Sequence, residues 1–148
     1  MKPLYHLVAS SFLGIAILVI TKSYPAALAA FLAGIFIDLD HLIDFWALES
    51  RKPFSIKDFL NAEKYDLQRK WVFIFLHSWE LMAGLFIWDY FHHWPVILTA
   101  ITVSMTFHLL LDIYNLTDRK MHPLTYFLVF RIIKGFKKVP SPYVSLHR

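Results

Sequence analysis

The sequence contains no cysteine and only four glycines among its 148 residues. The absence of cysteine excludes disulfides, thiolate metal sites and cysteine nucleophiles, so any metal site must use nitrogen and oxygen ligands. The few glycines form no glycine-rich phosphate-binding loop, and the serines form no nucleophile elbow. No repeat of fixed period and no low-complexity tract interrupts the chain. We therefore expect one domain over residues 1–148, with no separate soluble module.

The chain is rich in apolar residues and poor in charged ones. Hydrophobic residues make up 57% of the chain and aromatic residues 18%, whereas charged residues make up only 18%. A soluble domain of this size normally carries less apolar surface. Four stretches approach the roughly 20 apolar residues that cross a bilayer; they cover about residues 4–20, 25–46, 71–91 and 95–116. The sequence predicts an all-α integral membrane bundle of four transmembrane helices.

Two further segments have the composition of membrane-surface elements. Residues 49–70 are polar and charged, with Pro53 near the start and apolar residues interspersed. Residues 123–148 are first apolar and then basic, and the apolar part is too short for a span. Both patterns favour interfacial helices that lie along the headgroups.

Lysine and arginine orient the bundle, because they are enriched on the cytoplasmic flanks of transmembrane helices. With the N-terminus inside, the inner side receives Lys2, the six in the 49–70 loop and the seven after residue 118, and only Lys22 lies outside. We expect a protein of the cell (inner) membrane with both termini cytoplasmic. The net charge of +4 then indicates contact with anionic membrane lipids and no nucleic-acid partner.

A secretory signal peptide is the competing interpretation of the N-terminus. Lys2, the apolar run after it and the sequence Ala27-Leu28-Ala29 imitate the parts of such a peptide. Cleavage there would remove His6, which the predicted metal site includes.

Ionisable residues inside the spans fall at one depth in this topology. At 1.5 Å per residue each lies within roughly 5 to 15 Å of the inner boundary. Helical bundles build metal sites from side chains on facing helices in this way. The residues at this depth are His6, Asp38, Asp40, His41, Asp44, His77, Glu80, His108 and Asp112.

Helical spacing groups some of these residues. His77 with Glu80 (i, i+3) and His108 with Asp112 (i, i+4) would each share a helix face. Asp38 and Asp40 diverge by about 160° on a straight helix and cannot easily reach one ion. One aspartate binds metal while the other orients a histidine, or the helix unwinds there, or the two serve different ions; the spacing does not choose among these.

The carboxylates in the spans need a compensating partner, because placing one inside the bilayer costs on the order of 3 kcal/mol of free energy. A divalent cation offsets that cost. Histidine with carboxylate suits zinc, manganese or iron, and we expect one or two ions, with zinc favoured. A metal-activated water would then hydrolyse the substrate, with Glu80 or the non-ligating aspartate of the Asp38/Asp40 pair as the general base. Glu80 and Asp40 are the candidate catalytic residues, and Asp40 is also a candidate ligand.

Four segments carry a resemblance to a known family over about residues 4–115. "YHLVASSFLG", "GIFIDLDHLIDF", "LHSWE" and "FHLLLDIYN" resemble, in this order, the membrane-bound metal-dependent hydrolase family, also described as LexA-binding, inner-membrane-associated hydrolases. The likeness to zinc-dependent phospholipase C is more distant. The stretch "KWVFIFLHSWE" lacks the histidine-arginine-glycine approach of the commoner form, which points to a divergent subgroup. The resemblance implies a metal site built from His6, Asp38, Asp40, His41, His77, His108 and Asp112.

The leading prediction is a membrane-bound metal-dependent hydrolase that cleaves a phosphoester or related bond at the cytoplasmic interface. The basic inner flanks favour an anionic, lipid-like substrate. A metal-ion binding or transport protein is one alternative, and it predicts a polar path to the outer side. A non-catalytic scaffold with a buried His/Asp network is another, and it predicts no metal.

Overall fold

The computed structural model of the chain describes residues 3–43, 70–114 and 122–140. Within these ranges every regular element is helical, which confirms the all-α prediction; the one β-feature there is an isolated antiparallel bridge between Trp71 and Lys137. The elements are α1 (Pro3–Thr21), α2 (Tyr24–Phe36), η1 (Ile37–Asp40), α6 (Trp79–Phe91), α7 (Val96–Tyr114), η2 (Pro123–Tyr126) and α9 (Leu128–Ile133).

Two tight turns connect the long helices. Lys22 adopts φ 56° after α1, and the Ser23 side chain caps α2 by accepting a hydrogen bond from the Ala26 N–H at 3.3 Å. His93 and Trp94 both adopt φ 57° between α6 and α7. A proline in the first turn of the next helix stabilises such an antiparallel connection, because its fixed φ suits a helix start.

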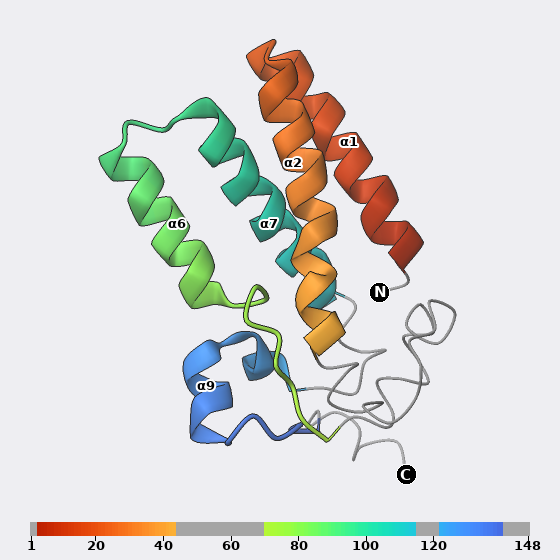
Figure 1. Cartoon of the computed structure of the whole chain (residues 1–148), viewed down its shortest axis with the longest axis vertical. Coiled ribbons are helices and arrows are strands. Elements are labelled where there is room, and N and C mark those ends of the chain that lie inside the picture. The colour runs from red at the N-terminus through yellow and green to blue at the C-terminus, as the bar shows by residue number, and fades with distance from the viewer. Residues whose placement is uncertain (1–2, 44–69, 115–121, 141–148) are drawn as a thin grey trace.

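Helix α2 packs between α1 and α7 through small residues (Figure 1). Its buried positions are Ala26, Ala30 and Gly34. The Ser104 hydroxyl of α7 donates to the Ala30 carbonyl at 2.6 Å. Small residues let helix backbones approach closely, which is how helices associate where lipid removes the hydrophobic driving force.

Gly34→Ala is expected to destabilise this three-helix contact. An added Cβ would meet the Ser10 hydroxyl and lie 2.9 Å from the Ser104 oxygen, so both serines would have to move. Overpacking of this kind costs about 1 to 3 kcal/mol. Gly84→Ala on α6 is the matched control: its Cβ meets nothing within 4 Å, and a helical alanine gains about 0.5 to 1 kcal/mol over glycine. Thermal unfolding in detergent should show opposite shifts, and equal shifts would contradict the packing.

Two helices are long and apolar enough to cross a membrane, Tyr24–Ile43 and Val96–Tyr114. The apolar stretch of α1, Tyr5–Thr21, is shorter, and α6 has only 13 residues. The described residues therefore show two helices of spanning length and not clearly the four that the sequence predicted. All four helices nevertheless expose large apolar side chains; examples are Phe12, Leu28, Phe91 and Val96.

The predicted helix over 71–91 is wrong in its first eight residues. Helix α6 begins only at Trp79, where the Ser78 side chain caps it by accepting from the Leu81 N–H at 3.3 Å. Residues 70–78, which we call the strap, are not helical. The predicted loop 49–70, except Lys70, the ends of the second and fourth predicted spans beyond residues 43 and 114, Asp44 and residues 141–148 lie outside the described residues.

Candidate metal centre

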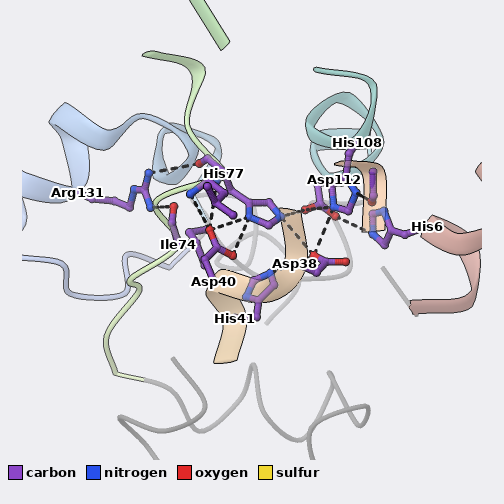
Figure 2. A network of polar contacts seen from close by, with 11 residues as sticks. His6, Asp38, Asp40, His41, Ile74, His77, His108, Asp112 and Arg131 are labelled. Atoms are coloured by element: carbon purple, nitrogen blue, oxygen red, sulfur yellow. Dashed lines mark hydrogen bonds and ion pairs between the residues drawn. The ribbon is translucent and has the colours of Figure 1, made fainter. Parts of the chain in front are cut away.

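The polar ends of four segments meet at one end of the bundle. The start of α1, the end of α2, the residues before α6 and the end of α7 lie there together (Figure 1). Helix α9 lies beyond that end, next to the strap (Figure 1). As Figure 2 shows, histidines and aspartates from all four segments point toward one another. This convergence agrees with the expectation that the ionisable residues share one depth.

His77 is held by the carboxylate of Asp40. The His77 Nδ1–H donates to this carboxylate, at 3.1 Å from Oδ1 and 3.2 Å from Oδ2. Because a carboxylate only accepts, Nδ1 carries a proton, and Nε2 is the ring nitrogen that faces the cluster and would bind an ion. Nε2 is buried and makes no hydrogen bond. Histidines that bind metals commonly donate their other ring N–H to a carboxylate in this way, and that hydrogen bond fixes the orientation of the ring.

His108 is held in the same way by a backbone carbonyl. Its Nδ1–H donates to the Gly34 carbonyl at 2.8 Å, across the contact between α7 and α2. The Nε2 atom again is buried without a hydrogen bond. Two histidines from different segments therefore direct their Nε2 atoms to the same space.

Two aspartates complete this space. Asp38 Oδ1 lies 3.4 Å from Nε2 of His77 and 3.4 Å from Nε2 of His108. Asp112 Oδ2 lies 3.5 Å from Nε2 of His77 and 3.9 Å from Nε2 of His108. Ligand atoms bound tetrahedrally to zinc at 2.0 to 2.1 Å are about 3.3 to 3.4 Å apart. The four histidine–aspartate distances are near that spacing, which is long for hydrogen bonds, and Asp38 and Asp112 belong to different groups of ligand atoms.

His6 and His41 lie next to this group, His6 beside Asp112 and His41 beside Asp38 (Figure 2). His6 Nε2 lies 3.2 Å from Asp112 Oδ1, and its ring stacks on that of His108 at 3.9 Å between centroids. His41 Nε2 lies 3.6 Å from Asp38 Oδ1. Asp112 thus directs one oxygen to His6 and the other to His77, as a carboxylate between two neighbouring ions would.

The residues fit a divalent metal ion. Three overlapping groups have ligand atoms within 4.8 Å of one another, and each contains carboxylate and imidazole groups suitable for a transition metal. His6, His77, His108 and Asp112 are buried, so without a cation their polar atoms are costly. The groups are His6 with Asp38 and His108, Asp38 with His41 and His77, and His77 with His108 and Asp112.

Asp40 is absent from these groups, although it was predicted as a ligand. Residues 37–40 form the 3₁₀ helix η1, whose tighter winding brings Asp38 and His41 onto one side. The buried Asp40 side chain faces the strap instead, where Oδ2 accepts from the Leu76 N–H at 2.8 Å and from the His77 N–H at 3.3 Å. Of the interpretations left open by the sequence, the structure favours an Asp40 that orients a histidine.

Glu80, predicted as a general base, lies outside the cluster. Its Oε2 accepts from the Leu128 N–H at 2.8 Å and its Oε1 from the Val129 N–H at 3.0 Å. These are the first residues of α9, so the carboxylate occupies the position of a helix-capping group. The expected pairing of His77 and Glu80 on one helix face does not occur, because His77 precedes the helix.

Arg131 is a structural residue that sequence reasoning missed. Its guanidinium is buried and donates to the carbonyls of Ile74 and His77, the latter at 3.3 Å. Asp40 accepts from N–H groups of the strap, and Arg131 donates to its carbonyls. In a helix these backbone groups would pair with one another, and in apolar surroundings they need partners. A lone arginine in the apolar stretch "LTYFLVFRII" was the available signal, because buried charges need named partners.

Fold and centre together define a class: an all-α protein with helices of membrane-spanning length and a buried histidine–aspartate cluster that could hold a metal ion. No family model, curated protein or solved structure matches the chain.

Proposed function

We propose that this protein is a membrane-bound metal-dependent hydrolase that cleaves a phosphoester or related bond at the cytoplasmic membrane interface. The observation that carries the proposal is the pair of oriented histidines, His77 and His108, whose Nε2 atoms lie 3.4 Å from a shared Asp38 oxygen. Such imidazole–carboxylate sets bind zinc, manganese or iron. The resemblance of the histidine and aspartate motifs to membrane-bound metal-dependent hydrolases supports the same activity.

The number of candidate ligand side chains is sufficient for one or two ions. Even without His41, five histidines and aspartates exceed the four ligands of one tetrahedral ion, and the two oxygens of Asp112 face different histidines. A divalent ion, when bound, activates water and draws charge from a phosphoryl oxygen. The contribution of this chain is to fix the ligand geometry before the ion binds, through Asp40 behind His77 and the Gly34 carbonyl behind His108.

Substrate reaches the cluster on the side of Asp38 and His41 in this proposal. The Asp38 side chain is 30% exposed and that of His41 16%, whereas His77 and Asp112 are fully buried. His41 lies 3.6 Å from a carboxylate, an arrangement that suits a proton acceptor. We assign His41 to take the proton from the attacking water.

The membrane topology belongs to the same proposal. Helices α1, α2, α6 and α7 form the bundle in the bilayer, with the cluster at the cytoplasmic end and both termini inside, as the lysine and arginine distribution predicts. The large apolar side chains that all four helices expose favour this placement, since their contact with water is unfavourable.

Hydrolysis of phosphoesters by the detergent-purified chain tests the proposal. Phosphomonoester, phosphodiester and phospholipid substrates are offered before chelation, after chelation, and after return of zinc, manganese or iron. We expect one substrate class to be hydrolysed, with loss on chelation and recovery with metal. Asp112→Asn should abolish this activity, and Asp89→Asn, a buried aspartate outside the cluster, should retain it. A metal-loaded, folded protein that hydrolyses none of these substrates contradicts the proposal.

His41→Gln separates proton transfer from metal binding. We expect kcat to fall by about 100-fold or more, the usual contribution of a general base, while metal content stays at the parent value. The measurement is kcat beside elemental analysis on the same preparation. Loss of metal in this variant would instead make His41 a ligand and overturn its assignment.

A further inference from the structure

Helix α9 presents its charged residue inward and several of its apolar residues outward. Its one buried residue is Arg131, whereas Val129, Ile132 and Ile133 are 57 to 72% exposed. The helix has only six residues, fewer than a helix needs to be stable by itself in water. Apolar burial therefore contributes little to holding α9, and its position depends on polar contacts with other segments.

Glu80 supplies the first of these contacts, at the start of α9. The residue before the helix, Phe127, makes no side-chain capping hydrogen bond. The Leu128 N–H donates instead to Glu80 Oε2 at 2.8 Å, and the Val129 N–H donates to Oε1 at 3.0 Å. A carboxylate at this place pairs the free N–H groups of the helix and interacts favourably with the helix dipole. Glu80 therefore caps α9 from 48 residues away.

Arg131 supplies the second contact, three residues after Leu128. Its guanidinium donates to the carbonyls of Ile74 and His77 in the strap. On the other side, Glu80 follows His77 by three residues. The two contacts therefore join the strap and the start of α6 to α9 at two points in antiparallel order. One contact alone would let α9 pivot, whereas two fix its position and its direction against the strap.

We infer that Glu80 is a positioning residue of the metal centre, which acts through Arg131 on His77. Its carboxylate fixes the start of α9, and α9 carries the guanidinium that holds the His77 carbonyl. A shift of this backbone would move the His77 Nε2 atom away from Asp38 Oδ1, now at 3.4 Å. Glu80 itself belongs to none of the metal-binding groups. The inference rests on the metal centre of the proposed function and does not need hydrolysis.

The zinc affinity of the detergent-purified Glu80→Ala variant, measured by competition with a chromophoric chelator, tests the inference. We expect a loss of about 10-fold, the lower end of the range for partners behind metal ligands, because Glu80 acts through a further residue. Glu80→Gln should lose less, since its amide oxygen still accepts from one N–H. Ser23→Ala is the matched control: it removes the capping side chain of α2, at the end of that helix opposite the cluster. This control should change zinc affinity by less than about 2-fold, as for an independent distant site.

The double variant Glu80→Ala with Arg131→Met shows whether Glu80 acts through Arg131. Without the guanidinium, the position of α9 no longer affects the His77 carbonyl. The double variant should therefore bind zinc as weakly as Arg131→Met alone, within about 2-fold. Losses that multiply would show that the two residues act independently and would overturn the inference. If Arg131→Met does not fold, Glu80→Gln with Arg131→Lys gives the same comparison with milder changes.

Amide hydrogen exchange of the metal-free chain provides a second measurement that needs no bound ion. Peptides from the strap should exchange at least about 10-fold faster in Glu80→Ala than in the parent chain, and at the parental rate in Ser23→Ala, because only the first variant loosens α9. Unchanged exchange in a Glu80→Ala variant that circular dichroism shows to be folded would overturn the inference alone. A parent chain that binds no metal, with faster exchange in this variant, would contradict the proposed function alone and support the hold of Glu80 on the strap.

Discussion

Asp38→Asn is expected to lower the affinity of the protein for a divalent metal ion such as zinc by more than about 100-fold. The Asp38 Oδ1 atom is the common neighbour of three imidazole nitrogens, those of His41, His77 and His108, at 3.4 to 3.6 Å. The amide keeps the shape of the side chain but removes the negative charge that a divalent ion requires. Outer partners of metal ligands already contribute 10- to 100-fold, so loss of a direct carboxylate should exceed that range. Competition with a chromophoric chelator measures the affinity.

Asp89→Asn is the matched control for this change. Within the described ranges, Asp89 is also buried and its two carboxylate oxygens have no hydrogen-bond partner, yet it lies on α6 and in none of the metal-binding groups. The same substitution there should leave metal affinity unchanged. Equal losses in both variants would show that the effect comes from a general response to lost buried charge, and would contradict the role of Asp38.

Arg131→Met is expected to destabilise the strap by about 3 kcal/mol and to weaken metal binding about 10- to 100-fold. Without the guanidinium, the carbonyls of Ile74 and His77 stay buried and lose their donors, and each such group costs about 1 to 3 kcal/mol. His77 then loses the backbone support that fixes its ring, which is the loss expected for a partner behind a ligand. Two quantities are measured: the free energy of unfolding, by detergent-denaturant titration, and the metal affinity.

Two control variants separate the hydrogen bonds of Arg131 from its positive charge. Lys134→Met, an exposed cation of the same segment, should change stability by less than about 0.5 kcal/mol. Arg131→Lys retains the charge but cannot donate to both carbonyls in one fork, so we expect an intermediate loss. A folded Arg131→Met variant with parental stability and parental metal affinity would contradict the account of the strap.

The position of the cluster at one end of the bundle could be predicted from sequence because it depends on local information. The length of each apolar run and the sides on which lysines and arginines fall place His6, His41, His108 and Asp112 near one end of their helices. The structure then brings these side chains together from α1, the end of α2 and α7. No tertiary detail was needed for that expectation beyond antiparallel packing.

The strap could not be predicted in the same way, because residues distant in sequence hold it. An apolar run before Ser78 has the composition of a span, yet its N–H groups are paired by Asp40 and its carbonyls by Arg131, 36 to 57 residues away. Glu80 likewise caps a helix 48 residues later. One local signal was present: "WVFIF" is rich in β-branched and aromatic residues, which favour extended backbone over helix.

Metal content of the detergent-purified full chain, by elemental analysis after chelation and reconstitution with zinc, manganese and iron in turn, tests the central claim most directly. We expect one or two ions per folded chain for at least one of these metals, with loss of metal in a folded His77→Ala variant. A folded parent chain that retains none of the three metals would contradict it, and the histidines and aspartates would then form a hydrogen-bonded network in a membrane scaffold.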